Sequence, residues 1–263
     1  MYLIQGMRNA GIDVDTRLAS IGIKLDAIDP NSIIHDSLEW DIQYVIGKDV
    51  APENGLFIGQ HYALAGYGPL LMLLVTSDSI RTAICKGIEY QKLTHLSGEL
   101  DLITTTAKTS LVYRPSDLNS SIGLLRAQCE VSGTYKFIQD IYKMMGLMAP
   151  EIRVELPFSA PQDPQILHQY YDYYGPNLHF GHTCAAFSLD ADVLDVKIPS
   201  ADAITHRVYE VKCQTEIDRL NAEQKKQPLL VQQVHDYLEL QQGVIPTMAE
   251  TAFALNIPER TLR

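Results

Sequence analysis

Residues 245–263 read IPTMAETAFALNIPERTLR, and this stretch decides the fold of the C-terminal part of the chain. Thr247 and Glu250 have the spacing of a capping box, in which two side chains satisfy free amides at a helix start. Residues 256–257 then supply a turn, and Pro258, whose φ suits a first helical turn, opens a second helix. A short helix, a tight turn and a second helix are typical of the helix-turn-helix, whose second helix enters the major groove of DNA.

Two arginines lie on the predicted second helix. Arg260 and Arg263 are three residues apart and share a face, where a guanidinium can bond both O6 and N7 of a guanine. Thr261 is expected to contact a phosphate or to support the structure. Glu259 suits a helix N-terminus electrostatically, and it can also accept a hydrogen bond from cytosine. These four residues are the predicted DNA-binding residues, and the alternative is a solvated helix end.

The rest of the chain alternates helical and strand patterns. The region up to residue 96 is mainly helical, and its strongest helix is predicted at residues 77–95 with Ser77 or Asp78 as the cap. Further helices are predicted at residues 121–145, 165–174 and 201–220, and strands at residues 100–106, 109–114, 151–156, 177–180 and 183–188. This order predicts an α+β fold with a largely antiparallel sheet, followed by an all-α segment.

A polar stretch separates the two predicted parts. Residues 221–227 read NAEQKKQ and offer no apolar anchor, which favours a linker. We therefore expect residues 1–220 to form one domain, to which the resemblance described below assigns effector sensing and dimerisation. Residues 228–263 are expected to form the first part of a helix-turn-helix domain, beginning with a helix that Pro228 opens.

Several phrases resemble AraC-type transcription regulators. Residues 252–263 resemble their first helix-turn-helix, although Pro258 stands where the family often has Ser. Residues 55–59 (GLFIG), 66–68 (GYG) and 77–83 (SDSIRTA) resemble the arabinose-binding-like N-terminal domain of the ornithine-utilisation-regulator branch. The later phrases of that domain are similar to Pro161, residues 170–171 (YY), residues 175–180 (GPNLHF) and residues 189–194.

The resemblance covers nearly the whole chain and implies a regulator, not an enzyme. It implies that a small-molecule effector of unknown identity binds the N-terminal domain and modulates promoter binding by the complete C-terminal domain. It also implies base contacts by Arg260 and Arg263. The chain stops before the family's second helix-turn-helix, so it is expected to be C-terminally truncated and to bind DNA poorly by itself. We expect no cofactor, and a homodimer through residues 121–145 or 201–220, unless those faces belong to the core.

The charge of the chain is unevenly distributed. The net charge is −11, which by itself argues against a nucleic-acid binder. Residues 221–263, however, carry five acidic and four basic residues, so that nearly all the negative charge lies in residues 1–220. The four cysteines form no C-x-x-C pair, no signal peptide is evident, and the longest apolar run, residues 69–75, is too short to cross a bilayer. A cytoplasmic protein without a membrane partner is expected.

Two other classes of function are alternatives to a transcription regulator. A metal or haem sensor would use His168, His179 and His182, but His179 points away from His182 if this stretch is a strand, and the spacing is not that of zinc sites. An α+β enzyme without DNA binding would need a catalytic pair that lies together only in space, because no catalytic motif is present. The tyrosines of residues 170–174 are expected to pack in the core or an interface.

Overall fold

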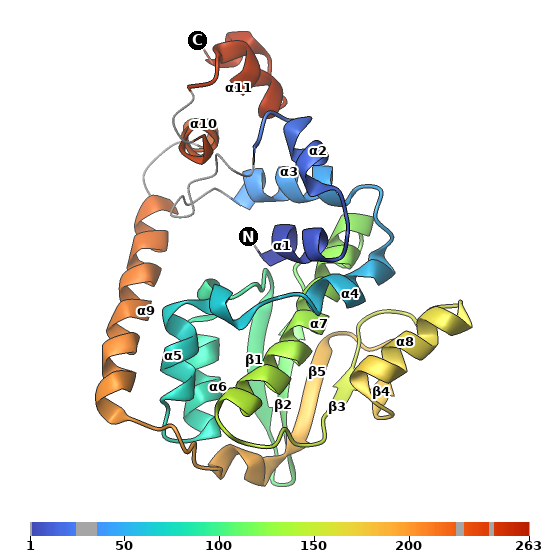
Figure 1. Ribbon diagram of the computed structural model, residues 1–263, viewed down its shortest axis with the longest axis vertical. Coiled ribbons are helices and arrows are strands. Elements are labelled where there is room, and N and C mark those ends of the chain that lie inside the picture. The colour runs from blue at the N-terminus through green and yellow to red at the C-terminus, as the bar shows by residue number, and fades with distance from the viewer. Residues whose placement is uncertain (1, 25–35, 225–228, 242–244, 263) are drawn as a thin grey trace. The chain divides into compact units, whose positions relative to one another are not determined.

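The computed structural model describes residues 2–24, 36–224, 229–241 and 245–262 (Figure 1). Contacts within the chain divide it into two compact units. The first, here called the sheet unit, consists of Met1–Gly6 and Ala51–Ile217. The second, the helical unit, consists of Met7–Val50 and Asp218–Arg263. The helical unit is therefore assembled from both ends of the chain.

A five-stranded mixed sheet organises the sheet unit, in the order β1-β2-β5-β3-β4. All neighbours are antiparallel except β3 and β4, which are parallel. The strands are β1 (Glu99–Thr104), β2 (Lys108–Arg114), β3 (Arg153–Glu155), β4 (Leu178–His179) and β5 (Ala185–Asp190). The predicted hairpin is confirmed, with Glu99 opposite Arg114 and the amide of Thr105 donating to the carbonyl of Lys108 at 2.8 Å. The predicted α+β class is also confirmed, with one parallel pair in the sheet.

Helices pack on and around this sheet (Figure 1). They are α4 (Gly55–Gly59), α5 (Pro69–Val75), α6 (Ile80–Glu89), α7 (Ser121–Met144), α8 (Pro164–Tyr174) and the first part of α9 (Ala203–Gln224). Short 3-10 helices connect them: η2 (Pro52–Asn54), η3 (Leu64–Tyr67), η4 (Gln91–Leu93) and η5 (Ala191–Asp195). Helix α1 (Tyr2–Asn9) begins in the sheet unit and ends in the helical unit. The predicted helices at 121–145, 165–174 and 201–220 are confirmed.

The predicted helix at residues 77–95 is wrong at both ends. Its N-cap is Ser79, not Ser77 or Asp78, because the Ser79 backbone is extended and forms a β-bridge with Lys197. The hydroxyl of Ser79 accepts a hydrogen bond from the amide of Thr82, as an N-cap should. The helix ends before Tyr90, which is buried, and a 3-10 turn follows. Tertiary contacts at both ends thus override the apolar periodicity of the stretch.

Helix α7 is the central helix of the sheet unit, and residues on all its sides are buried along its first half. Helix α4 packs directly on its backbone. A Cβ added to Gly55 would lie 2.6 Å from the Cβ of Gln128, and one added to Gly59 would lie 2.7 Å from the amide nitrogen of Gly133. The hydroxyl of Ser132 donates to the carbonyl of Gly55 at 2.9 Å. The two glycines of the 55–59 phrase therefore permit a backbone approach that no other residue allows.

The core of the sheet unit has two parts. One part lies between the sheet, α7 and α8, and its largest buried members include Tyr113, Tyr174 and Phe187. The other lies between α5, α6, the C-terminal half of α7 and α9, and includes Leu70, Leu73 and Cys213. All four cysteines of the chain are free.

The helical unit contains α2 (Val14–Ala19), α3 (Asp36–Gly47), α10 (Leu229–Leu240), α11 (Met248–Ala254) and the 3-10 helix η6 (Glu259–Leu262). Its N-terminal and C-terminal pieces are in contact. The Tyr237 side chain is buried, and the side-chain Nε2 of Gln241 donates to the carbonyl of Gly22 at 3.3 Å. Of the expected linker, residues 221–224 continue helix α9, and residues 225–227 lie outside the described residues, as does Pro228.

No helix within the described part of the chain is both long enough and apolar enough to cross a membrane.

Candidate effector cavity and candidate DNA-recognition segment

A cavity of about 120 Å³ lies inside the sheet unit. Helices α5, α6 and α7 and strands β1, β2 and β5 all contribute to its wall. Most of the lining side chains are apolar, among them Leu70, Ile84, Phe137, Ile141, Phe187 and Leu189. The cavity lies where the two parts of the core meet, because the bulky side chains of the helices and of the sheet do not fill all the space between them.

One end of the cavity wall carries polar side chains, which already have hydrogen-bond partners within the protein. The Nδ1 atom of His95 lies 2.6 Å from the hydroxyl of Tyr67, and its Nε2 atom lies 3.0 Å from the carbonyl oxygen of Glu130. Desolvation, together with the positive charge of Arg126, lowers the pKa of His95 to about 4, although the hydrogen bond to the carbonyl of Glu130 opposes the shift. The imidazole is therefore neutral at pH 7. Its Nδ1 accepts from Tyr67 and its Nε2–H donates to the carbonyl, which is the tautomer that satisfies both contacts.

Aromatic rings surround this histidine. The ring of Tyr62 lies 5.1 Å from that of His95, the ring of Tyr2 lies 5.7 Å away, and the ring of Tyr67 lies 5.8 Å away, all edge-on. Edge-to-face pairs at these distances are favourable because the positive edge of one ring meets the negative face of another. Tyr2 begins helix α1, so this cluster ties the N-terminus to the cavity wall.

Tyr142 also lines the cavity, and its hydroxyl is buried. Within the described residues this hydroxyl has no hydrogen-bond partner. Burial raises the pKa of Tyr142 to about 12, so the group keeps its proton at neutral pH and remains a donor. An unsatisfied buried hydroxyl costs about 1–3 kcal/mol.

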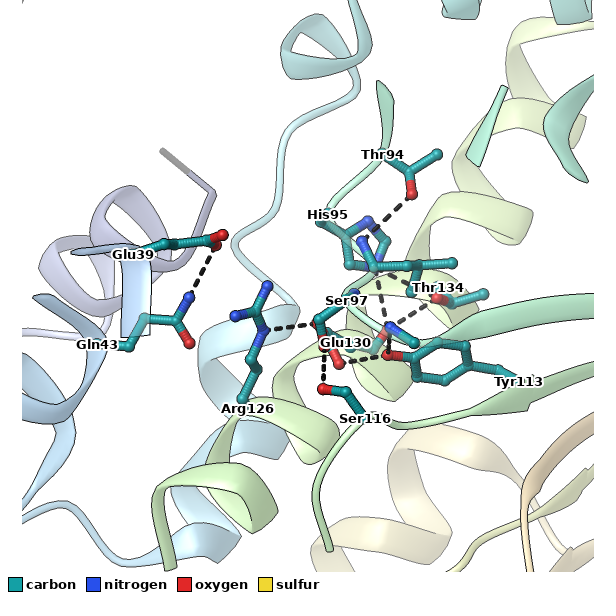
Figure 2. A network of polar contacts seen from close by, with 12 residues as sticks. Glu39, Gln43, Thr94, His95, Ser97, Tyr113, Ser116, Arg126, Glu130 and Thr134 are labelled. Carbon is teal, nitrogen blue, oxygen red and sulfur yellow. Dashed lines mark hydrogen bonds and ion pairs between the residues drawn. The ribbon is translucent and has the colours of Figure 1, made fainter. Parts of the chain in front are cut away.

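A buried carboxylate holds the polar end in place, as Figure 2 shows. Glu130 on α7 is 1% exposed and accepts hydrogen bonds from Arg126 Nε at 2.9 Å, from the amide of Ser97 at 2.9 Å and from the hydroxyl of Tyr113 at 2.5 Å. Burial raises the pKa of Glu130, although the charge of Arg126 opposes the rise. This network joins α7, β2 and the loop that carries His95.

The candidate DNA-recognition segment begins with α11. Its predicted capping box is confirmed: the Thr247 hydroxyl accepts from the amide of Glu250 at 3.3 Å, and the Glu250 carboxylate accepts from the amide of Thr247 at 2.7 Å. The predicted turn is confirmed as well. Asn256 has φ +50°, and the amide of Ile257 donates to the carbonyl of Ala252 at 3.0 Å, which is the hydrogen bond of a Schellman motif.

The predicted DNA-binding residues follow this turn. Glu259, Arg260 and Thr261 are all exposed on η6, and Arg263 lies outside the described residues. The predicted second helix begins here as the 3-10 helix η6. The amide of Thr261 donates to the carbonyl of Pro258, three residues back, which is the pattern of a 3-10 helix and is frequent where helices begin.

The histidines considered for a metal site are spread over the surface. His168 faces Asp172 on its own helix at 3.4 Å, and His182 Nδ1 lies 3.5 Å from Glu155. The rings of His179 and His182 are 6.5 Å apart. Over the described ranges, no three His, Cys, Asp or Glu side chains are grouped so as to hold a metal ion.

The tyrosines of residues 170–174 pack largely as expected. Tyr170 and Tyr174 are buried in the core, and the hydroxyl of Tyr173 donates to the carbonyl of Ser132 at 2.8 Å. The side chain of Tyr171 is 40% exposed. The residues of the cavity were not found from sequence, because their side chains come from separate elements and form no motif.

An apolar cavity in an α+β domain is typical of a ligand-binding domain. The model of the family described as the arabinose-binding domain of AraC transcription regulator, N-terminal, matches residues 11–198, and the chain belongs to this family. It is thus an AraC-family transcription regulator, a class that is not enzymatic.

One solved structure supports the fold. It is described as the crystal structure of transcriptional regulator CdpR from Pseudomonas aeruginosa, and it is similar with a TM-score of 0.56 at 19% identity. The similarity covers 95% of this chain and 76% of that chain. A search of curated proteins found no match.

Proposed function

We propose that this chain is a ligand-responsive, DNA-binding transcription regulator that acts in the cytoplasm. The family match supports this proposal, and the observation that carries it is the apolar cavity within the matched residues. In this proposal, residues 1–220 sense a small-molecule effector and form a homodimer, and residues 228–263 begin the DNA-binding domain, with residues 221–227 between them. This division concerns function, whereas the two compact units describe packing.

DNA recognition is assigned to the segment after α11. The Schellman turn at Asn256 changes the chain direction and presents the next residues to solvent. Arg260 and Thr261 are exposed and within reach of a nucleic acid, and Arg263 is assigned to the same surface from its spacing. Arg260 and Arg263 would contact base edges, Thr261 a phosphate, and Glu259 would favour the helix start.

Regulation requires that the effector binds two states of the protein unequally. A ligand in the cavity shifts the population toward the state that binds it more tightly, and DNA affinity changes by the same coupling free energy. The partners are therefore promoter DNA and a small molecule.

The test is a salt series of binding to DNA from the protein's own upstream region. It uses a protein that carries the family's complete DNA-binding domain. Sequence-specific binding with a steep salt dependence supports the proposal. Weak binding that is equal on scrambled DNA would contradict it.

Arg260→Ala is the variant that tests the predicted base contact. It is expected to weaken binding at the cognate site by about 1–3 kcal/mol and to relax preference at one base pair. Arg153→Ala, which removes an exposed arginine from the sheet unit, is the charge-matched control and should bind as the parent does. An equal loss on all DNA sequences would show that Arg260 contacts only phosphate.

A further inference from the structure

The cavity of the sheet unit has no charged group to offer a ligand. Among its described lining residues there is no Asp, Glu, Lys or Arg, and His95, with a pKa of about 4, is neutral at pH 7. A carboxylate, phosphate or ammonium group would lose its hydration there without gaining a counter-ion. Charged metabolites such as amino acids therefore do not suit this site.

The cavity does not suit a sugar either. The polar lining groups are largely occupied: Tyr67 bonds to His95, and the hydroxyl of Thr134 donates to the carbonyl of Glu130 at 2.7 Å. The hydroxyl of Thr94 donates to the carbonyl of Gln91 at 2.6 Å. A ligand with a hydroxyl on nearly every carbon would leave most of them unpaired against apolar walls, which is costly. This chain therefore departs from the ligand that its family description names.

The Tyr142 hydroxyl remains without a partner within the described residues, but its oxygen is buried and not exposed to the cavity. The surface that faces the cavity is therefore almost wholly apolar and calls for no polar group on the ligand. The volume of about 120 Å³ is slightly below that of the apolar cavity of about 150 Å³ that holds benzene in another protein. The space thus suits one six-membered ring or a short branched chain.

We infer that the effector is a small, uncharged and mainly apolar molecule, which this cavity binds through apolar contacts. Only the statement that the bound molecule is an effector rests on the proposed function. The binding chemistry follows from the cavity alone.

The test uses the 263-residue chain with labelled isoleucine methyl groups, observed by NMR. Ile84 and Ile141 line the cavity and report on its occupation. The probes are cyclohexanone, methylcyclohexane, cyclohexanecarboxylate and L-arabinose. The first two are uncharged rings of similar size, of which only cyclohexanone has an acceptor. Both should shift the two methyl signals in a saturable way, methylcyclohexane at lower concentration because it loses less hydration on entering an apolar cavity, and the carboxylate and the sugar should not.

Three variants locate the binding. Tyr142→Phe removes only a hydroxyl that is not exposed to the cavity, and it should leave the binding of both rings unchanged. Gly87→Leu places a side chain in the cavity wall on α6 and should abolish the binding of both rings. Cys85→Leu adds similar bulk to the exposed side of the same helix and should leave both unchanged.

Three outcomes would overturn the inference. They are saturable shifts with arabinose or the carboxylate at lower concentration than with cyclohexanone, no shift with either neutral ring, or binding that survives Gly87→Leu. These titrations contain no DNA, and the salt series contains no ligand. The two proposals can therefore be refuted independently of each other. Ring binding without specific DNA binding would leave the cavity chemistry in place and remove the regulator. Specific DNA binding without ring binding would do the reverse.

Discussion

Replacing Arg126 by methionine tests how the buried carboxylate of Glu130 is held. Glu130 is 1% exposed, and Arg126, whose side chain is 11% exposed, lies 2.9 Å from it. Methionine keeps much of the length and apolar contact of the arginine stem but removes the charge and the donor. The amide of Ser97 and the hydroxyl of Tyr113 remain as neutral partners of the carboxylate.

The loss of stability in Arg126→Met is limited because Glu130 can become protonated. Breaking a buried ion pair costs about 3–5 kcal/mol when the remaining charge stays buried. Glu130 can avoid this by taking up a proton, which at pH 7 costs about 3.7 kcal/mol for an ordinary glutamate and about 1.4 kcal/mol less for each unit of lower pH. The loss of stability is therefore limited to about 3.7 kcal/mol at pH 7 and about 1 kcal/mol at pH 5.

The sign of the pH dependence is set by the raised pKa of Glu130. Burial already raises this pKa in the folded protein, so the folded state binds the proton more tightly than the unfolded chain. Stability then falls as the pH rises from the unfolded pKa to the folded pKa. Without Arg126 the folded pKa rises further, so the fall continues to higher pH.

The assay is urea unfolding followed by far-UV circular dichroism at pH 5 and pH 7. Arg81→Met is the control, because Arg81 lies 2.9 Å from Asp195 in an exposed pair and should contribute less than about 1 kcal/mol at either pH. Adding Glu130→Gln to Arg126→Met should restore much of the stability at pH 7. A loss that is equal at pH 5 and pH 7 would refute the argument, since the penalty would then not come from the charge of Glu130.

Substitutions at four further positions test the packing and the turns by urea unfolding or amide exchange. Gly59→Ala should destabilise by about 1–3 kcal/mol because its Cβ would meet the backbone of α7, whereas Gly87→Ala, with its nearest contact at 3.8 Å, should be neutral or stabilising; equal effects would contradict the close approach of α4 and α7. Thr247→Ala should cost about 1 kcal/mol and speed amide exchange in α11, and unchanged exchange would argue against the capping box. Asn256→Gly should be tolerated and Asn256→Ala should not, because φ is +50° there; the opposite order would argue against the turn.

Elements with a strong local pattern could be predicted from the sequence. The β1–β2 hairpin alternates apolar and polar residues around a short turn, and α7 has a Ser cap followed by a long periodic run. The capping box of α11 is a contact between near neighbours in the chain, so its residues alone specify it. The helix predicted at residues 77–95 could not be placed correctly from its local pattern. A β-bridge between Ser79 and Lys197 fixes its start, and Lys197 is too distant in the sequence to be recognised as a partner.

The cavity and its polar end could not be predicted, because they depend on contacts between distant segments. His95 meets Tyr67 from another helix, and Glu130 meets Tyr113 from a strand. Tyr142 has the same local pattern as any core tyrosine of an amphipathic helix, and only the arrangement of its neighbours leaves its hydroxyl without a partner within the described residues. The exposed position of Arg260 follows the sequence more closely, since the turn before it is local.

The composition of the helical unit has a consequence for the order of events during synthesis. Met7–Val50 leaves the ribosome early, but it packs with Asp218–Arg263, which emerge after the whole of the sheet unit. Ala51–Ile217 is continuous and can fold while translation proceeds, since domains generally fold as they are made. The first segment must therefore wait for residues 218–263 before the helical unit can be completed. A polypeptide released early would contain the part with the cavity but would lack the part assigned to DNA.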